Sequence, residues 1–247
     1  MTPDPQPGRA GGDSISIVMP ARDEEPRLQA AVTDVLEAAR QQFARYELII
    51  VDDGSVDRTA IIADRLASDL AGVRVIHLAK PHGLGGAFKA GLVYATMDYV
   101  TVAHGDGGTP SSQLEKIWAR RAEADLIIPY IVNDAQRPLH RVLVSRAFRW
   151  TVNTLFRIRV RYHLHYVLYR RPLIQSVDLR TDSHAFQAEA VVKLLRRGCS
   201  FIEVGVEDDF VSQAPTRSYS LANIRRVALF FARTLYDVYG GGSAGRR

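Results

Sequence analysis

The first hundred residues alternate between short apolar runs and amphipathic stretches of helical length. The apolar runs have the length and composition of buried strands and cover residues 15–19, 46–51, 73–78 and 99–103. The helical patterns between them extend to about residue 43, over 57–70 and over 85–96. Strands that alternate with helices in this way form βαβ units and a parallel sheet. The sequence therefore predicts an α/β fold.

A polar or glycine-rich cluster follows each of the four apolar runs. These clusters are residues 22–25, 52–55, 82–89 and 104–106. Ligands of parallel sheets bind at the carboxyl ends of the strands. We therefore expect the four clusters to meet at one edge of the sheet and to form a binding site there.

The pattern becomes less regular after residue 124. We expect strands at 125–130 and 200–206, a basic and aromatic stretch over 141–169, a helix at 185–197 ended by Gly198, and a terminal helix at 221–239. His163 and His165 alternate as they would in a strand, and a structural role is favoured for both. One domain is predicted over 14–239, with halves 14–130 and 131–239 and disordered tails at 1–13 and 240–247.

The 247 residues carry a net charge of +5, which favours anionic partners. The single cysteine, Cys199, excludes an intramolecular disulfide and a cysteine-based zinc site. No apolar run approaches the ~20 residues of a membrane span. We expect a cytoplasmic protein that is at most peripheral to the membrane. The basic stretch 141–161 is either a lipid-binding surface or a solvated helix face, and no nucleic acid partner is expected.

Two clusters have more than one interpretation on the residues alone. Asp52 and Asp53 can accept hydrogen bonds from a base or a ribose, or they can cap the next turn. Residues 82–86 suggest a dinucleotide-binding turn, but Phe88 stands where its third glycine belongs. A tight turn that lets the backbone approach a ribose or a phosphate fits this segment better.

In their order and spacing, these motifs resemble those of family 2 glycosyltransferases of the GT-A fold. The segments Ile-Val-Met-Pro-Ala-Arg-Asp-Glu at 17–24, Ile-Ile-Val-Asp-Asp-Gly-Ser-Val-Asp at 49–57 and the glycine-rich segment 83–91 are similar to those of dolichyl- and polyprenyl-phosphate mannose synthases. The resemblance implies a mostly parallel GT-A-type sheet with flanking helices and a C-terminal acceptor-binding part. It also implies a UDP- or GDP-sugar donor that contacts Pro20, Ala21, Arg22, Glu24, Asp52, Asp53, Gly85, Lys89, His104, Gly105 and Asp106.

The metal-binding Asp-x-Asp of this family corresponds to His104-Gly105-Asp106. The resemblance implies a divalent cation, Mn²⁺ or Mg²⁺, held by Asp106 and His104. An imidazole ligand suits Mn²⁺ better than Mg²⁺. The alternative is a metal-free site in which arginines neutralise the diphosphate.

The resemblance also implies roles in acceptor binding and in inverting sugar transfer. Arg141 and Ser145 match an Arg-x-x-x-Ser motif that faces the acceptor phosphate, and Arg217 takes the place of a mobile-loop lysine. A hydroxyl or amine acceptor would need a base, for which Asp182 and Glu189 are candidates, although Glu189 can equally anchor a helix. The expected catalytic residues are Asp106, Asp182, Glu189 and Arg217.

Two acceptor motifs of the family are absent from this chain. Its Gly-Ser-Arg is replaced around residues 128–130, and its Asp-x-Thr-Ser-Gly-Phe-Arg is replaced by residues 161–167. The acceptor is therefore either a polyprenyl phosphate or a soluble natural product or glycoconjugate. A catalytically silent nucleotide-sugar-binding subunit is the alternative function, and the sequence does not indicate an oligomeric state.

Overall fold

A computed structural model describes residues 13–133, 139–207 and 229–240 of the chain. Within these ranges, no helix combines the length and the apolar character that crossing a membrane requires. The strands are β1 (Ser14–Ala21), β2 (Arg45–Asp52), β3 (Val73–His77), β4 (Tyr99–Val102), β5 (Leu126–Ile131), β6 (Leu168–Arg170) and β7 (Phe201–Val206). The α-helices are α1 (Leu28–Gln42), α2 (Thr59–Asp69), α3 (Leu84–Leu92), α4 (Ser111–Trp118), α5 (Leu139–Phe156), α6 (Arg171–Gln175) and α7 (Phe186–Arg196).

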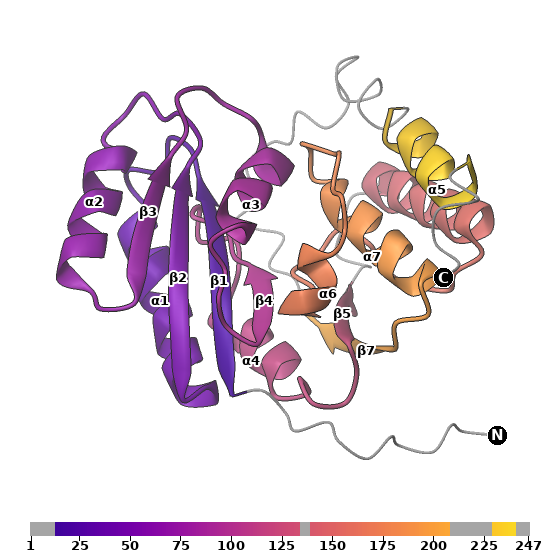
Figure 1. Ribbon diagram of the computed structural model, residues 1–247, viewed down its shortest axis with the longest axis horizontal. Helices are drawn as coiled ribbons and strands as arrows, with labels where there is room; N and C mark the ends of the chain where they lie inside the picture. Colours follow the sequence, from indigo (N-terminus) through magenta and orange to yellow (C-terminus); the bar gives the residue numbers. More distant parts are fainter. Residues whose placement is uncertain (1–12, 134–138, 208–228, 241–247) are drawn as a thin grey trace.

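The seven strands form one mixed sheet in the order β3-β2-β1-β4-β6-β5-β7. Strand β6 is antiparallel to its neighbours β4 and β5, and every other pair is parallel. Strands β1 to β3 lie at one end of the molecule, with α1 and α2, while α5 and α7 lie toward the other end (Figure 1). The α/β fold predicted from the sequence is confirmed, and strands from both halves of the chain share the sheet.

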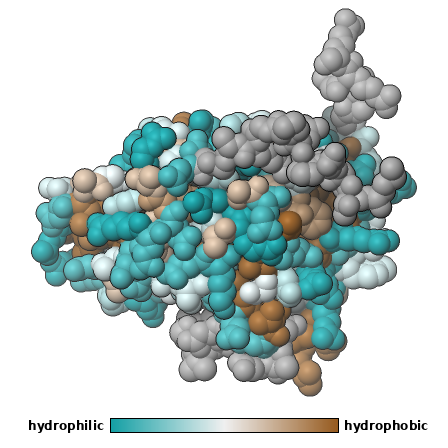
Figure 2. Space-filling view, turned by 90° about the horizontal axis from the view of Figure 1, so that it is seen from below, coloured by the Kyte–Doolittle hydropathy of each residue, from teal (hydrophilic) through white to brown (hydrophobic). Residues whose placement is uncertain are grey.

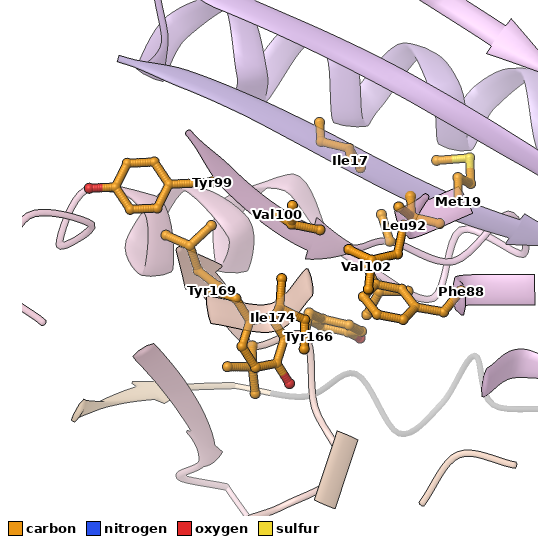
Figure 3. Packing of buried hydrophobic residues seen from close by; sticks show 14 of the residues in the cluster. Ile17, Met19, Phe88, Leu92, Tyr99, Val100, Val102, Tyr166, Tyr169 and Ile174 are labelled. Atoms are coloured by element: carbon orange, nitrogen blue, oxygen red, sulfur yellow. The ribbon is translucent and has the colours of Figure 1, made fainter. Parts of the chain in front are cut away.

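The core explains why the strands of the first half could be predicted from the sequence. Strand β1 and the last six residues of β2 are buried, as expected for parallel strands covered on both faces. Side chains of β1, β4, α3 and the segment 166–174 pack together in this core (Figure 3). The surface is mostly polar. On the face shown in Figure 2, hydrophilic residues predominate and apolar residues form separate patches.

Several elements depart from the predictions. Helix α3 ends at Leu92 and not at residue 96, because the amides of Thr96 and Met97 donate to Ser16 and Glu47 in the strands. The stretch 141–169 is not uniform, since it contains most of α5, an irregular segment and the start of β6. The interpretation of residues 163 and 165 as part of a strand was wrong. Helices α4 and α6 were not predicted.

The predicted terminal helix is described only in part. Residues 221–228 lie outside the described ranges, residues 229–235 are helical, and Tyr236–Gly240 forms a π-helix. The predicted tails lie almost wholly outside the described ranges as well. The helix predicted at 185–197 is confirmed as α7, and Gly198 follows its end with a φ of +86°.

Candidate active site

Three of the predicted clusters meet at the carboxyl ends of β1, β2 and β4. Ala21 pairs with Asp52 in the parallel register, and the Asp53 amide donates to the Ala21 carbonyl over 2.9 Å. On the other side of β1, the Gly105 amide donates to the Pro20 carbonyl over 3.1 Å. The segment that follows β1 therefore lies between the Asp52-Asp53 pair and the His104–Asp106 motif.

Gly105 permits this close contact. A Cβ atom at this position would lie 2.8 Å from the Cβ of Ala21 and 3.2 Å from the carbonyl oxygen of Pro20. Cβ atoms in real proteins do not approach other atoms so closely, and any larger residue would push the motif away from β1. The glycine therefore sets the position of Asp106 at this edge.

Asp53 holds the glycine-rich turn. Its buried carboxylate accepts hydrogen bonds from the amides of His82, over 2.6 Å, and Gly83, over 2.8 Å. Both amides come from a segment about 30 positions further along the chain. Asp53 thus fixes the fourth predicted cluster, residues 82–89, against the same edge.

Asp52 is held by the protein in a different way. Its carboxylate accepts a hydrogen bond from the Ser55 amide over 3.0 Å and lies 3.1 Å from Nδ1 of His77. Burial by itself would raise the pKa of Asp52, but the hydrogen bonds from Ser55 and His77 outweigh it and lower this pKa. Hydrogen bonds to Asp52 and Asp64 raise the pKa of His77, whose Nε2 lies 2.9 Å from Asp64.

The contact between His77 and Asp52 makes the folding stability depend on pH. The pKa of His77 is raised on folding. Its contribution to folding stability is therefore complete below the pKa of ~6.5 in the unfolded chain, and it is lost as the pH rises through the higher pKa in the folded protein. The His77→Gln variant should therefore lose stability at pH 5.5 and lose less at pH 9. We expect a difference below about 1 kcal/mol, since the imidazole is partly exposed. Urea unfolding of both proteins at the two pH values measures it, and an equal loss at both would contradict the assignment.

A loop before α7 closes the glycine-rich turn from the other side. The Gly85 amide donates to the carbonyl of Asp182 over 2.9 Å, and a Cβ at Gly85 would lie 2.4 Å from the carbonyl oxygen of Thr181. The Asp182 carboxylate pairs with the ammonium group of Lys89 at 2.5 Å. Two predicted site residues, Lys89 and Asp182, therefore bind each other.

Glu189 anchors this loop. Its fully buried carboxylate accepts hydrogen bonds from the amides of Arg180 and Thr181, and it pairs with Lys193 at 2.6 Å. Lys193 also contacts Asp237 of the π-helix at 2.7 Å. A carboxylate so fully engaged is not free to take a proton from an acceptor. Of the two interpretations of Glu189, the geometry favours the anchor over the base.

The His104–Asp106 motif combines a half-buried imidazole with an exposed carboxylate. Nε2 of His104 is buried without a hydrogen-bond partner in the described part of the chain, and burial lowers the pKa of His104. Its imidazole is therefore neutral at pH 7, the form that can bind a metal. The Asp106 carboxylate accepts the Gly108 amide at 2.8 Å and is otherwise exposed.

The side chains of Asp106 and His104 are too few to complete the coordination of a cation without a bound ligand. Among the described residues, no group of three or more histidine, cysteine or carboxylate side chains is placed to hold a metal. A divalent cation at Asp106 and His104 would therefore take its other ligands from a bound diphosphate and water. Burial, and then the nearby charge of Asp106, raise the pKa of Glu24.

Aromatic and histidine side chains lie around His104, and no pattern in the sequence predicted this grouping. The His104 ring lies 5.5 Å from the ring of Tyr166 and 6.4 Å from that of His184. Tyr166 in turn donates a hydrogen bond to the Gly108 carbonyl and lies 4.1 Å from the ring of His165. Burial lowers the pKa of His165 to about 3, so this second imidazole is also neutral.

The remaining predicted residues are only partly described. Arg22 is exposed beside Asp23. Ser145 lies on α5 and lines a pocket between this helix and the end of β5. The side chain of Arg141 and the whole of Arg217 lie outside the described residues.

Comparison with known proteins provides three matches of different extent. The model of the family described as glycosyl transferase family 2 matches residues 16–177. A polyprenol monophosphomannose synthase of Mycolicibacterium smegmatis is 29% identical over 207 residues, which cover 77% of this chain and 75% of that protein. A human dolichyl-phosphate beta-glucosyltransferase is 34% identical over 110 residues, but these cover only 42% of this chain and 34% of that protein.

The fold is also found in a solved structure. A crystal structure of glucosyl-3-phosphoglycerate synthase from Mycobacterium tuberculosis, in complex with Mn²⁺, uridine diphosphate and phosphoglyceric acid, superposes with a TM-score of 0.69. The match covers 96% of this chain and 82% of that one, at 18% identity. At this identity the likeness shows a common fold and leaves the substrates of the present chain open.

Proposed function

Because the chain belongs to glycosyl transferase family 2, we propose that it is an inverting glycosyltransferase that moves a sugar from a nucleotide-sugar donor to an acceptor. The observation that carries this proposal is the meeting of four clusters, separated in sequence, at one edge of the sheet. Ligands bind at this edge in open α/β sheets. The donor would lie across the ends of β1, β2 and β4.

Roles for the donor-site residues follow from their places at this edge. The segment 20–24 and the Asp52-Asp53 pair would receive the nucleoside, and the turn held by Asp53 would approach the ribose. Each carboxylate oxygen can accept more than one hydrogen bond, so contacts with the protein leave Asp52 able to accept a further one. Asp106 would face the diphosphate.

A divalent cation is part of this proposal. Asp106 and the neutral imidazole of His104 would hold it, and the cation would supply neutralisation of the charge that develops on the departing diphosphate. The Mn²⁺ and uridine diphosphate in the mycobacterial synthase structure support this choice. The rings of Tyr166 and His184, which lie 5.5 Å and 6.4 Å from the ring of His104, would exclude water from one side of the diphosphate.

The states of the candidate bases favour an acceptor that attacks as an anion. Glu189 is held by two amides and Lys193, and Asp182 is paired with Lys89. A phosphate or carboxylate acceptor is already ionised and needs no base, whereas a hydroxyl does. The names of the polyprenol- and dolichyl-phosphate relatives agree with a lipid-phosphate acceptor, while the altered motifs at 128–130 and 161–167 favour a soluble one.

The proposed function is tested by donor binding and turnover. A thermal-shift screen with UDP-, GDP- and TDP-sugars, with and without Mn²⁺, should give stabilisation by one nucleotide class. Release of the nucleoside diphosphate then shows turnover. Stabilisation without any release over a panel of acceptors would support the silent-subunit alternative, and no stabilisation by any donor would refute both.

Helix α5 supports a proposed peripheral contact with membranes. Leu139, Leu143 and Trp150 recur on one face of this helix and are 81%, 64% and 69% exposed, with Arg146 on the same face. We expect sedimentation with anionic vesicles that weakens as salt rises, and a weaker interaction in Trp150→Ala. Tyr94→Ala, an exposed aromatic residue of the first half, is the control. Salt-resistant binding to neutral vesicles would contradict this prediction.

A further inference from the structure

The C-terminal segment, residues 229–240, is fixed against two helices of the domain. Figure 1 shows it, in yellow, beside α5, and the Tyr239 hydroxyl donates to the Leu155 carbonyl of that helix over 2.8 Å. The guanidinium of Arg196, on α7, stands 5.6 Å from the centre of the Tyr239 ring. The segment ends in a π-helical turn, a rare conformation that often lies at functional sites. Its place in the fold is therefore defined by contacts with both α5 and α7.

Asp237, in the π-helical turn, connects this segment to the loop before α7. One oxygen of its carboxylate lies 2.7 Å from Nζ of Lys193, and the other lies 3.2 Å from Nη1 of Arg180. Arg233 of the same segment donates to the Arg180 carbonyl over 3.4 Å. Asp178, the other carboxylate that pairs with Arg180, belongs to the loop itself and does not link it to another element. The C-terminal segment thus holds the loop at Arg180.

Lys193 makes the contact with Asp237 hard to replace. An ammonium group has three N–H donors. Those of the buried Lys193 reach the carboxylates of Glu189 and Asp237 and the carbonyl of Asp178, at 2.6, 2.7 and 2.7 Å. Loss of the Asp237 charge would leave a buried cation with one partner fewer, which is unfavourable. Lys193 and the loop that it holds should then move to regain a partner.

A movement of this loop would reach the glycine-rich turn of the donor site. Thr181 and Asp182 follow Arg180 directly, and the Asp182 carbonyl accepts the Gly85 amide over 2.9 Å. A Cβ atom at Gly83 would lie 2.8 Å from the same carbonyl oxygen. The two backbones are therefore packed without space for a side chain between them. A displacement at Arg180 would leave the turn without this support.

We propose that Asp237 is a positioning residue of the donor site, and that the C-terminal segment sets the donor affinity through Arg180 and Lys193. The inference rests on the proposed function, since it assigns residues that regulate the donor site of that reaction. Asp237 acts on the position of the glycine-rich turn and touches neither donor nor acceptor. Coupling between two places is reciprocal, so a bound donor should in turn stabilise the C-terminal segment.

The first test follows the glycine-rich turn without any ligand. Hydrogen exchange of the full chain is measured by mass spectrometry for the wild type, Asp237→Asn and Arg180→Gln. The peptide that covers residues 82–88 should exchange at least about fivefold faster in Asp237→Asn, because the carbonyl that holds the Gly85 amide is displaced. Peptides from β1 and β2 should exchange as in the wild type. Arg180→Gln removes a partly exposed guanidinium, so it keeps the test available if Asp237→Asn fails to fold.

Asp125→Asn is the matched control for this experiment. Its side chain is 18% exposed, against 15% for Asp237, and it pairs with Arg170 at 3.5 Å. Asp125 precedes β5, at the edge of the sheet opposite the donor site, so exchange at residues 82–88 should not change. Faster exchange confined to residues 229–240 in Asp237→Asn, or equal acceleration throughout the sheet, would overturn the proposal. No nucleotide is needed, so this result does not depend on the proposed function.

The second test measures donor affinity. UDP and GDP, each with Mn²⁺, are titrated by calorimetry into the same four proteins. The Kd of the nucleotide that binds the wild type should rise about 5- to 50-fold in Asp237→Asn, and less in Arg180→Gln, which keeps the contact of Asp237 with Lys193. The Kd of Asp125→Asn, and kcat of all variants at saturating donor, should stay within about twofold of the wild type.

The outcomes separate this inference from the proposed function. An unchanged Kd in both Asp237→Asn and Arg180→Gln would refute the inference and leave the glycosyltransferase proposal standing. Failure of the wild type to bind either nucleotide would refute the proposed function and, with it, the donor role of Asp237. Bound nucleotide should also slow the exchange of residues 236–240 in the wild type and not in Asp237→Asn. Equal slowing in both proteins would contradict the role of Asp237.

Discussion

The Asp106→Asn variant is expected to lower donor turnover by about 10²- to 10³-fold, the usual loss when one charged group that stabilises a transition state is removed. Asp106 is the exposed carboxylate of the motif, and Gly105 holds it against β1. Replacing it with asparagine preserves the shape and the hydrogen bond from Gly108. The fold should therefore be retained, and the loss should come from the missing negative charge at the diphosphate.

The same experiment examines His104. Release of the nucleoside diphosphate, by transfer or by hydrolysis, is measured with EDTA, Mg²⁺ and Mn²⁺ for the wild type, Asp106→Asn and His104→Asp. With one carboxylate and one neutral imidazole, the wild type should bind a cation more weakly than the paired carboxylates of His104→Asp. Full activity of Asp106→Asn would refute the site. Strong Mg²⁺ dependence that is unchanged in His104→Asp would show that His104 is only a structural neighbour.

The Glu189→Ala variant is expected to lose about 3–5 kcal/mol of folding stability, as is typical when one partner of a buried ion pair is removed. The substitution leaves the amides of Arg180 and Thr181 without their acceptor and leaves Lys193 with Asp237 as its remaining carboxylate. Urea unfolding measures the loss. Glu37→Ala, an exposed glutamate on α1, is the control and should change stability by less than about 0.5 kcal/mol.

This measurement separates the two roles considered for Glu189. If Glu189 is an anchor, the Glu189→Ala variant should be less stable. Its donor binding should weaken too, because the loop that Glu189 holds contacts Gly85 and Lys89. A catalytic base would instead leave stability and donor affinity intact while turnover falls. The second outcome would contradict the interpretation of Glu189 as an anchor.

The parts of the fold that could be predicted have a strong local pattern. Strands β1, β2 and β4 are buried apolar runs, and each is followed by polar or glycine-rich turn residues. Strand β6 could not be found in this way. It has three residues, too few for a period, and it depends on pairing with β4 and β5 more than 40 residues away in sequence.

The candidate site shows the same division. The motifs placed the clusters at the right edge, because strand ends are local features. The partners of the carboxylates were not readable, since the Asp53 hydrogen bonds reach the amides of residues 82 and 83, and Glu189 binds amides of a loop with no regular structure. Every residue except proline has a backbone amide, so the sequence does not show which amides donate to a given carboxylate. Only the fold shows which carboxylates are engaged and which, like Asp106, stay exposed.

The position of β6 between β4 and β5 has a consequence for synthesis on the ribosome. A nascent chain that has emerged only as far as residue 131 contains β5, but none of its partners β6 and β7 has yet been made. One side of β4 is unpaired at the same moment. Unpaired apolar strands attract other chains, so this stage is the one most exposed to aggregation. Slow translation between residues 131 and 206 should therefore lower the yield of folded protein, and chaperones that shield apolar segments should restore it.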